Sequence, residues 1–192
     1  MHVETVTLRA TVADHRKGPS DPFPQVAFAG RSNVGKSSLL NSLFGERLAA
    51  VSKTPGKTRT INYYLVNRRW YFVDLPGYGY ARTGREQRQE WGRNITTYLR
   101  DEDRLRLVVG LIDPRIPTSP LDVELVGFVR EANKQLLLVM TKTDRMGRGA
   151  LSQATSRLAR ELAGGEPPVA FSAQTGTGRK EILAAIAQSL AA

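Results

Sequence analysis

Short apolar runs alternate with longer amphipathic segments along the chain, and this alternation is typical of a β-sheet covered by helices. Between residues 3 and 12 apolar and polar side chains instead alternate one by one, which predicts an edge strand. Further strands are expected at residues 25–29, 61–66, 70–73, 107–112, 136–140 and 169–171. Helices are expected at residues 36–44, 86–100, 121–131, 151–162 and 178–190.

This order predicts an α/β fold, a three-layer sandwich with a mostly parallel central sheet and helices on both faces. Residues 14–24 and 46–60 are expected to be loops, and residues 67–69 the turn of a hairpin. We expect one domain, in which residues 1–24 add the edge strand and a loop to a core formed by residues 25–192. No apolar run is long enough to cross a bilayer and there is no coiled-coil repeat, so a cytoplasmic monomer is expected.

Composition narrows the classes of function. The 192 residues include 28 Lys and Arg against 18 Asp and Glu, a net charge of +10. Arginine supplies 21 of the basic residues, which suits contacts with nucleic acid, although a compositional bias of the genome would also enrich it. The absence of cysteine excludes a disulfide framework, a thiolate metal site and a cysteine nucleophile. The two histidines both lie near the N-terminus, which argues against a Ser-His-Asp triad.

The strongest chemical signal is a G-x-x-x-x-G-K-S pattern between the first core strand and the first helix. Its residues are Gly30, Arg31, Ser32, Asn33, Val34, Gly35, Lys36 and Ser37. Glycines in this context let backbone amides converge on the phosphates of a nucleotide, and the helix start adds further amides. Lys36 is expected to reach the β- and γ-phosphates and the Ser37 hydroxyl to bind Mg²⁺. The alternative is a glycine-rich turn that binds nothing.

Two further segments offer groups for the metal and the γ-phosphate. Asp74-Leu75-Pro76-Gly77 follows an apolar strand, where Asp74 could hold Mg²⁺ through water and the Gly77 amide could sense the γ-phosphate. In the loop at 46–60, Thr58 and Thr60 are both eligible as a Mg²⁺ ligand, and spacing alone does not choose between them. A plain turn and a solvated loop are the simpler interpretations of the two segments.

A base-recognition segment, Thr141-Lys142-Thr143-Asp144, follows the strand at 136–140. The Asp144 carboxylate can accept both the N1–H and the N2 amino protons of guanine, which adenine does not offer in that pattern. The aliphatic stem of Lys142 would lie along the base. Backbone amides of Phe171-Ser172-Ala173, at the end of the last strand, could meet the guanine O6. The alternative for Asp144 is a loop residue that caps the next helix.

These five elements, in one order across residues 30–173, are those of a Ras-like P-loop GTPase of the translation-factor class. The strings G-R-S-N-V-G-K-S-S-L-L-N, S-K-T-P-G-K-T and D-L-P-G-Y-G-Y-A, with T-K-T-D, closely resemble the EngB family of bacterial ribosome-assembly GTPases. The resemblance covers essentially the whole chain. It implies a Mg²⁺-dependent switch that associates with the rRNA of the large (50S) ribosomal subunit during its maturation.

The resemblance also implies roles for single residues. Thr58 would be the second Mg²⁺ ligand beside Ser37, and Lys36, Thr58 and Gly77 would form the catalytic set. GTP would be contacted by Gly30 to Ser37, by Gly56, Lys57, Thr58, Arg59 and Thr60, by Asp74 to Gly77, by Thr141 to Asp144, and by Phe171, Ser172 and Ala173.

Three positions depart from common patterns. EngB proteins usually carry D-x-R-H where this chain has Asp113-Pro114-Arg115-Ile116, and no role follows for that segment. Thr141 lacks the amide with which an Asn would support the base and the phosphate loop, so we expect modest affinity, with guanine selectivity retained through Asp144. Tyr78 stands where Ras-like proteins place a water-orienting Gln. Unassisted hydrolysis should therefore be slow, on the order of 10⁻⁴ to 10⁻³ s⁻¹.

We hypothesise that K⁺, the ribosome or both accelerate hydrolysis. In several P-loop GTPases with an aromatic residue at the Gln position, an Asn at the position of Asn33 coordinates K⁺ beside the phosphates. The alternative is that Asn33 merely closes the loop. A GTP- and GDP-sensing module with negligible hydrolysis stays open as a second function. Asp144 opposes an ATP-dependent kinase, and the lack of an extra domain opposes a membrane or tRNA-modification GTPase.

Basic residues near the nucleotide-responsive loops are candidates for RNA contact. They are Arg82, Arg85, Arg88 and Arg93 after the D-x-x-G segment, Arg145 and Arg148 beside the base segment, and Arg68-Arg69 at the hairpin. Each cluster alone is usually a solvated face. Their grouping predicts an rRNA surface that the γ-phosphate controls.

Overall fold

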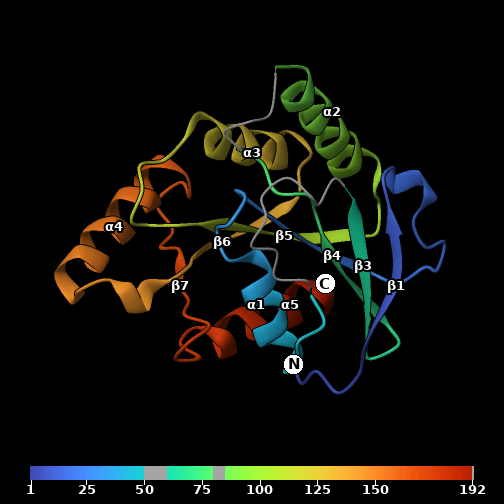
Figure 1. Ribbon diagram of the computed structural model, residues 1–192, viewed down its shortest axis with the longest axis horizontal. Coiled ribbons are helices and arrows are strands. Elements are labelled where there is room, and N and C mark those ends of the chain that lie inside the picture. Colours follow the sequence, from blue (N-terminus) through green and yellow to red (C-terminus); the bar gives the residue numbers. More distant parts are fainter. Residues whose placement is uncertain (50–59, 80–84, 192) are drawn as a thin grey trace.

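A mixed β-sheet runs through the centre of the molecule, with helices on both sides (Figure 1). The computed structural model describes residues 1–49, 60–79 and 85–191, and for residues 85–91 it describes the backbone alone. The strands are β1 (Val6–Val12), β2 (Gln25–Gly30), β3 (Ile61–Val66), β4 (Trp70–Asp74), β5 (Leu105–Ile112), β6 (Gln135–Met140) and β7 (Val169–Ala170). The helices are α1 (Lys36–Phe44), α2 (Arg85–Asp101), α3 (Pro120–Glu131), α4 (Arg148–Glu161) and α5 (Arg179–Ala191).

The described strands lie in the order β1-β3-β4-β2-β5-β6-β7. The strand β3 pairs antiparallel with both β1 and β4. The other neighbouring strands are parallel, and parallel neighbours need crossover connections, which the helices supply. The expected mostly parallel sheet and its N-terminal edge strand are confirmed.

The edge strand β1 begins at Val6, three residues later than the alternating pattern predicts. Before it, the Asn67 side-chain oxygen accepts hydrogen bonds from the N–H groups of Glu4 and Thr5, at 2.8 and 3.1 Å. Asn67 and Arg68 have φ values of 49° and 56°, the left-handed backbone of a tight hairpin turn. The side chain and the backbone of Asn67, whose N–H donates to the Thr5 carbonyl at 2.8 Å, therefore hold the first residues to the sheet.

The two faces of the sheet are covered by different helices. In β2, Val26 and Phe28 pack in a cluster with α1 and α5, whereas Ala27 and Ala29 pack in a cluster with α2 and α3. Figure 1 shows α2 and α3 above the sheet and α1 and α5 below it. A smaller cluster, which includes Leu158 of α4, joins that helix to the β6 side of the sheet. The predicted helices on both faces are confirmed.

Two elements begin two or three residues earlier than the sequence pattern predicts. The strand β5 starts at Leu105. The sequence pattern misses this start because an exposed Arg106 interrupts the apolar run between buried Leu105 and Leu107. The helix α4 starts at Arg148, three residues before its first large apolar residue, Leu151. Charged residues at element ends contribute backbone hydrogen bonds without contributing to a hydrophobic pattern, so the pattern underestimates both elements.

Candidate nucleotide-binding site

The parallel strands bring their carboxyl ends to one edge of the sheet, where ligand sites form in open α/β folds. Gly30 ends β2 and Asp74 ends β4, while Asp113 follows β5, Thr141 follows β6 and Phe171 follows β7. These five strands are consecutive neighbours in the sheet. The predicted phosphate, metal and base segments therefore lie side by side, although they are far apart in the sequence.

The phosphate-loop segment, residues 30–37, has a backbone that depends on its residue types. Asn33 and Gly35 have φ values of 64° and 113°, in the left-handed region that Asn and Gly tolerate best. Gly35 is the N-cap of α1, which begins at Lys36, and Ser37 lies half-buried in the first turn. The amides at a helix start attract anions. The segment thus has both the curled backbone and the helix start that phosphate binding requires.

Lys36 contacts the carboxylate of Asp74, which joins the phosphate loop to the start of the D-x-x-G segment. Both side chains are largely buried, with exposed fractions of 10% and 6%. The ammonium carries the charge that complements nucleotide phosphates, and the carboxylate carries the charge that complements a hydrated cation. The structure therefore places these two predicted groups in direct contact at the sheet edge.

The D-x-x-G segment runs closely along the phosphate loop. The Ser32 N–H donates to the Tyr78 carbonyl at 2.7 Å, and the Tyr78 N–H donates to the Gly30 carbonyl at 3.3 Å. A side chain at Gly77 would lie 3.2 Å from the backbone of Ser32, closer than most real contacts. A Cβ at position 77 would therefore displace the Ser32 backbone by a few tenths of an ångström, so glycine favours the close approach of the two segments.

The side chain of Tyr78 is buried, and its hydroxyl is directed toward α3. It is 3% exposed, and its Oη donates to the Oδ1 of buried Asp122 in the first turn of α3, at 2.8 Å. Burial, and then the nearby Asp122 charge, raises the pKa of Tyr78 far above its ordinary value. The phenol is thus neutral and bonded to α3.

The base-recognition segment is tied to both neighbouring loops. The Thr141 hydroxyl donates to the Val34 carbonyl of the phosphate loop at 2.6 Å. The Thr143 hydroxyl donates to the Phe171 carbonyl at 3.0 Å, after β7. Although Thr141 lacks an amide, its shorter hydroxyl still supports the phosphate loop, which the sequence comparison with an Asn did not suggest.

Asp144 is exposed and is held by a buried neighbour. The Ser172 hydroxyl donates to the Asp144 Oδ1 at 2.7 Å, and Ser172 is 1% exposed. The Ser172 oxygen in turn accepts the N–H groups of Gln174 and Thr175, each at 3.2 Å. The sequence predicted a role for the backbone of residues 171–173, but it missed that the serine side chain orients the carboxylate.

Two further predicted residues lie outside the loops described above. Thr60 is half-buried directly before β3, at the same end of the sheet as Asp74, because Asn62 of β3 pairs with Asp74. Arg93 is exposed on α2. The predictions for Gly56, Lys57, Thr58, Arg59 and Arg82 lie outside the described residues, as do those for the side chains of Arg85 and Arg88.

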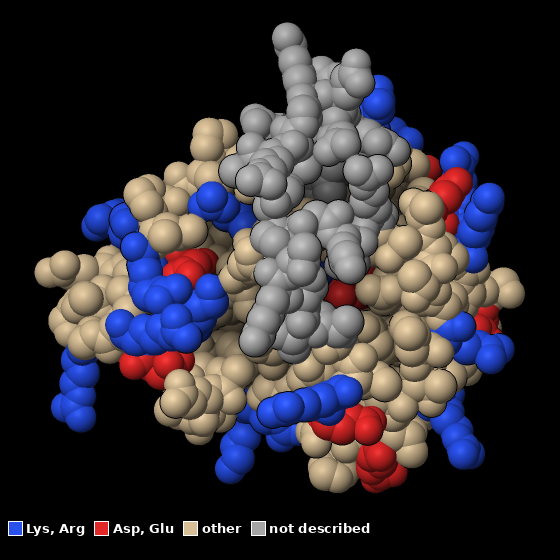
Figure 2. All heavy atoms as spheres, viewed as in Figure 1, with Lys and Arg blue, Asp and Glu red and all other residues tan. Residues whose placement is uncertain are grey.

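The basic hairpin is not near the nucleotide-responsive segments, so its predicted grouping with them is wrong. Arg68 and Arg69 precede β4, whereas Asp74 ends it. The hairpin therefore lies at the amino ends of the parallel strands, and the candidate site lies at their carboxyl ends. The Arg69 guanidinium lies 4.3 Å from the Trp70 ring centroid. By contrast, Arg145 directly follows the base segment and Arg148 begins α4, and both are exposed. Figure 2 shows Lys and Arg atoms gathered on the side of the molecule where Figure 1 places α4.

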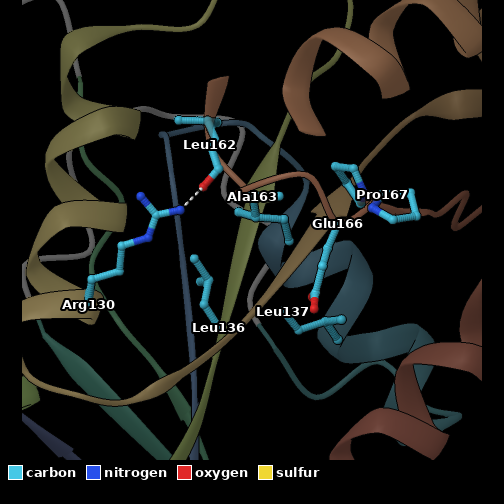
Figure 3. Close-up of a pocket in the computed structure, with 9 residues that line it drawn as sticks. Arg130, Leu136, Leu137, Leu162, Ala163, Glu166 and Pro167 are labelled. Atoms are coloured by element: carbon cyan, nitrogen blue, oxygen red, sulfur yellow. Dashed lines mark hydrogen bonds between the residues drawn. The ribbon is translucent and has the colours of Figure 1, made fainter. Parts of the chain in front are cut away.

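A cavity of about 130 Å³ lies elsewhere, at the start of β6 (Figure 3). Leu136 and Leu137 line it, and Arg130 closes one side by donating to the Leu162 carbonyl at 2.8 Å. It contains none of the residues that the sequence singled out. Among the described residues, no cluster of three His, Asp or Glu side chains could hold a metal, and no helix is long and apolar enough to cross a membrane.

The fold and the site define this protein as a P-loop GTPase. The family model described as 50S ribosome-binding GTPase matches residues 25–142. The chain belongs, more narrowly, to the EngB family of GTP-binding proteins. This confirms the resemblance seen in the sequence motifs.

The individual relatives cover nearly the full chain. A probable GTP-binding protein EngB of Syntrophomonas wolfei is 41% identical over 191 residues, 99% of each chain. One of Syntrophus aciditrophicus is 46% identical over 166 residues, 86% of this chain and 85% of its own. A crystal structure of a probable GTP-binding protein EngB matches with a TM-score of 0.74 at 23% identity, over 86% of this chain and 98% of that one. The last likeness shows the shared fold.

Proposed function

We propose that the protein is a cytoplasmic molecular switch that binds GTP with Mg²⁺, hydrolyses it slowly and assists maturation of the large ribosomal subunit. The observation that carries the proposal is the convergence at one sheet edge of Lys36 and Asp74 with Asp144. The family description as 50S ribosome-binding GTPases supports the ribosomal partner. GTP would order the nucleotide-responsive loops for rRNA binding, and hydrolysis would release them.

Mg²⁺ would be held by oxygen donors, which are the ligands this cation prefers. The Ser37 hydroxyl lies in the first turn of α1, at the end of the phosphate loop, and the Asp74 carboxylate lies beside Lys36 of the same turn. This donor set fits the cation, with Asp74 acting through water and Thr58 as the second protein ligand. When bound, Mg²⁺ would offset the negative charge of the phosphates. The amides of residues 33–37 and the Lys36 ammonium would bind and orient the phosphate groups.

Asp144 would read the base. Its Oδ1 already accepts the Ser172 hydroxyl, which joins the loops after β6 and β7. A carboxylate in this position accepts the two N–H donors of guanine, and an amide would not match them.

Base exchange tests this assignment. Fluorescent GDP bound to the wild-type protein should be displaced by GTP and not by ATP or XTP. In Asp144→Asn, GTP should compete at least about tenfold more weakly and XTP more strongly, because xanthine offers the complementary pattern. Asp101→Asn, an exposed carboxylate at the end of α2, is the matched control and should behave as wild type. Competition that is indifferent to the base would reject the guanine site.

The rival function is a GTP- and GDP-sensing module with negligible turnover. It differs from the favoured one only in hydrolysis, because both use the same nucleotide contacts. The inward-facing Tyr78 hydroxyl is consistent with slow unassisted hydrolysis, since the position that holds a water-orienting Gln elsewhere is occupied here by a side chain bonded to α3. An added K⁺ at Asn33, or the ribosome, would then supply the missing acceleration.

A further inference from the structure

A buried carboxylate that the sequence left without a role lies between the phosphate loop and the base segment. Asp113 directly follows β5 and is 6% exposed. Its Oδ1 accepts the Arg115 Nε at 2.9 Å and its Oδ2 accepts the Arg115 Nη2 at 2.7 Å. The Lys142 Nζ also donates to Oδ2, at 3.2 Å. One carboxylate thus binds two cations that come from different strand ends.

Lys142 is held at the far end of its side chain. Its Nζ donates to the Asn33 carbonyl of the phosphate loop at 2.7 Å, in addition to the contact with Asp113. Its backbone is left-handed, with a φ of 57°, which is uncommon for lysine. A long, flexible side chain with both ends fixed has little rotamer freedom left, so the course of its aliphatic stem is set by these two partners.

The charge of Asp113 is secure at physiological pH. Burial would by itself raise the pKa of this carboxyl, but hydrogen bonds from Arg115 and then Lys142 outweigh it and bring the pKa to about 2. The loop that carries Arg115 is itself attached to α4, because the Arg157 Nη2 donates to the Pro114 carbonyl at 3.2 Å. The carboxylate therefore has a fixed position as well as a fixed charge.

We infer that Asp113 is a positioning residue for guanine binding, which holds the Lys142 ammonium so that the lysine stem lies along the base. The Arg115 fork keeps the carboxylate turned toward Lys142. The inference rests on the proposed function, in which the Lys142 stem contacts the base. It assigns a role to the Asp113–Arg115 part of the segment that departs from the family pattern at Ile116.

The other end of β5 offers a matched control. Glu102 is 7% exposed and binds Arg104, two residues later, through Nε at 2.8 Å and Nη2 at 2.7 Å. The two acid-x-Arg pairs have similar burial and geometry and flank the same strand. Glu102, however, lies at the amino end of the sheet, away from the nucleotide site.

The experiment compares Asp113→Asn, Glu102→Gln and Lys142→Ala by GDP and GTP affinity and by thermal unfolding. Asp113→Asn should weaken both nucleotides about tenfold, roughly one charge-assisted hydrogen bond, with the GTP-to-GDP ratio unchanged. Glu102→Gln should lose stability but keep its affinity within about twofold. In the double variant with Lys142→Ala, Asp113→Asn should cause no further loss of affinity, because no stem is left to position.

The outcomes separate this inference from the proposed function. If Lys142→Ala leaves guanine-nucleotide affinity unchanged, the base site itself is wrong. If Lys142→Ala weakens binding but Asp113→Asn does not, or if the two losses add, the inference alone is overturned. Should Asp113→Asn fail to fold, Asp113→Glu keeps the charge and displaces it by one methylene, and it should weaken binding without the full loss of stability.

Discussion

Individual side chains at the candidate nucleotide site form hydrogen bonds that stabilise the neighbouring loops, in addition to the ligand contacts predicted for this site. The Thr141 hydroxyl supports the phosphate loop through the Val34 carbonyl, and the Ser172 hydroxyl supports Asp144. Asn33 likewise combines a predicted ligand role with a backbone role, because its left-handed φ of 64° by itself favours Asn or Gly. Its residue type therefore has a backbone explanation, and a role in K⁺ binding must be tested with that backbone preserved.

Asn33→Gly provides this test, because glycine adopts the same φ without strain and removes only the side chain. We expect wild-type single-turnover hydrolysis to be at least about tenfold faster in KCl than in NaCl. The variant should lose the difference between the two salts and keep its affinity for GDP. The same four reactions are repeated with 50S particles. Equal rates in both salts would remove the K⁺ hypothesis, and negligible rates in every condition would favour the binding module.

At the scale of elements, the D-x-x-G segment is coupled to α3. Ser119 and Asp122 form a capping box at the start of this helix, and Asp122 also accepts the Tyr78 hydroxyl. A segment expected to respond to the γ-phosphate is thus attached to a helix on the α2 and α3 face. Tyr78 is accordingly a structural link in this fold.

Tyr78→Phe should lower the free energy of unfolding by about 1–3 kcal/mol, because it leaves the buried Asp122 with one hydrogen bond fewer. Chemical denaturation measures this change. The single-turnover hydrolysis rate should stay within about twofold of wild type, since the hydroxyl faces α3. Tyr71→Phe, which removes a 2.6 Å hydrogen bond to the half-buried Asp21 at the other end of the sheet, is the control. A tenfold loss of hydrolysis in Tyr78→Phe alone would mean that the phenol does reach the reacting water.

At the scale of the whole molecule, the position of the positive charge decides which surface could face RNA. The net charge is +10, but the hairpin arginines lie away from the nucleotide edge, and Arg145 and Arg148 remain beside the base segment. Phosphate contacts release counterions, so each arginine that binds a phosphate adds to the salt dependence of binding.

Arg145→Gln with Arg148→Gln should therefore flatten the salt dependence of 50S binding, by roughly one unit of the log–log slope for each arginine that binds a phosphate in the wild type. Binding is measured by co-sedimentation with GTP analogue or GDP over a range of KCl concentrations. Arg100→Gln with Arg106→Gln changes the charge equally, at the amino end of the sheet, and should leave the slope unchanged. Identical slopes for the two double variants would place the RNA surface elsewhere.

The sequence by itself determined the elements whose chemistry is carried by adjacent residues. The phosphate loop could be predicted because Gly30 to Ser37 contain their own turn geometry and helix start, and the base segment because Thr141 to Asp144 directly follow an apolar strand. The alternating strands and helices likewise fixed the mostly parallel sheet. The bounds of β5 and α4 were less accurate, since exposed arginines at their starts do not enter a hydrophobic pattern.

Only the tertiary structure decided which distant side chains meet. Tyr78 pairs with Asp122, Ser172 with Asp144, and Lys142 with Asp113, each across at least 28 residues of sequence. These pairs depend on the strand order β4-β2-β5-β6-β7, which places the ends of separate segments next to one another. A polar side chain reaches only a few ångströms, and the local sequence does not specify which distant residue the sheet brings within that distance.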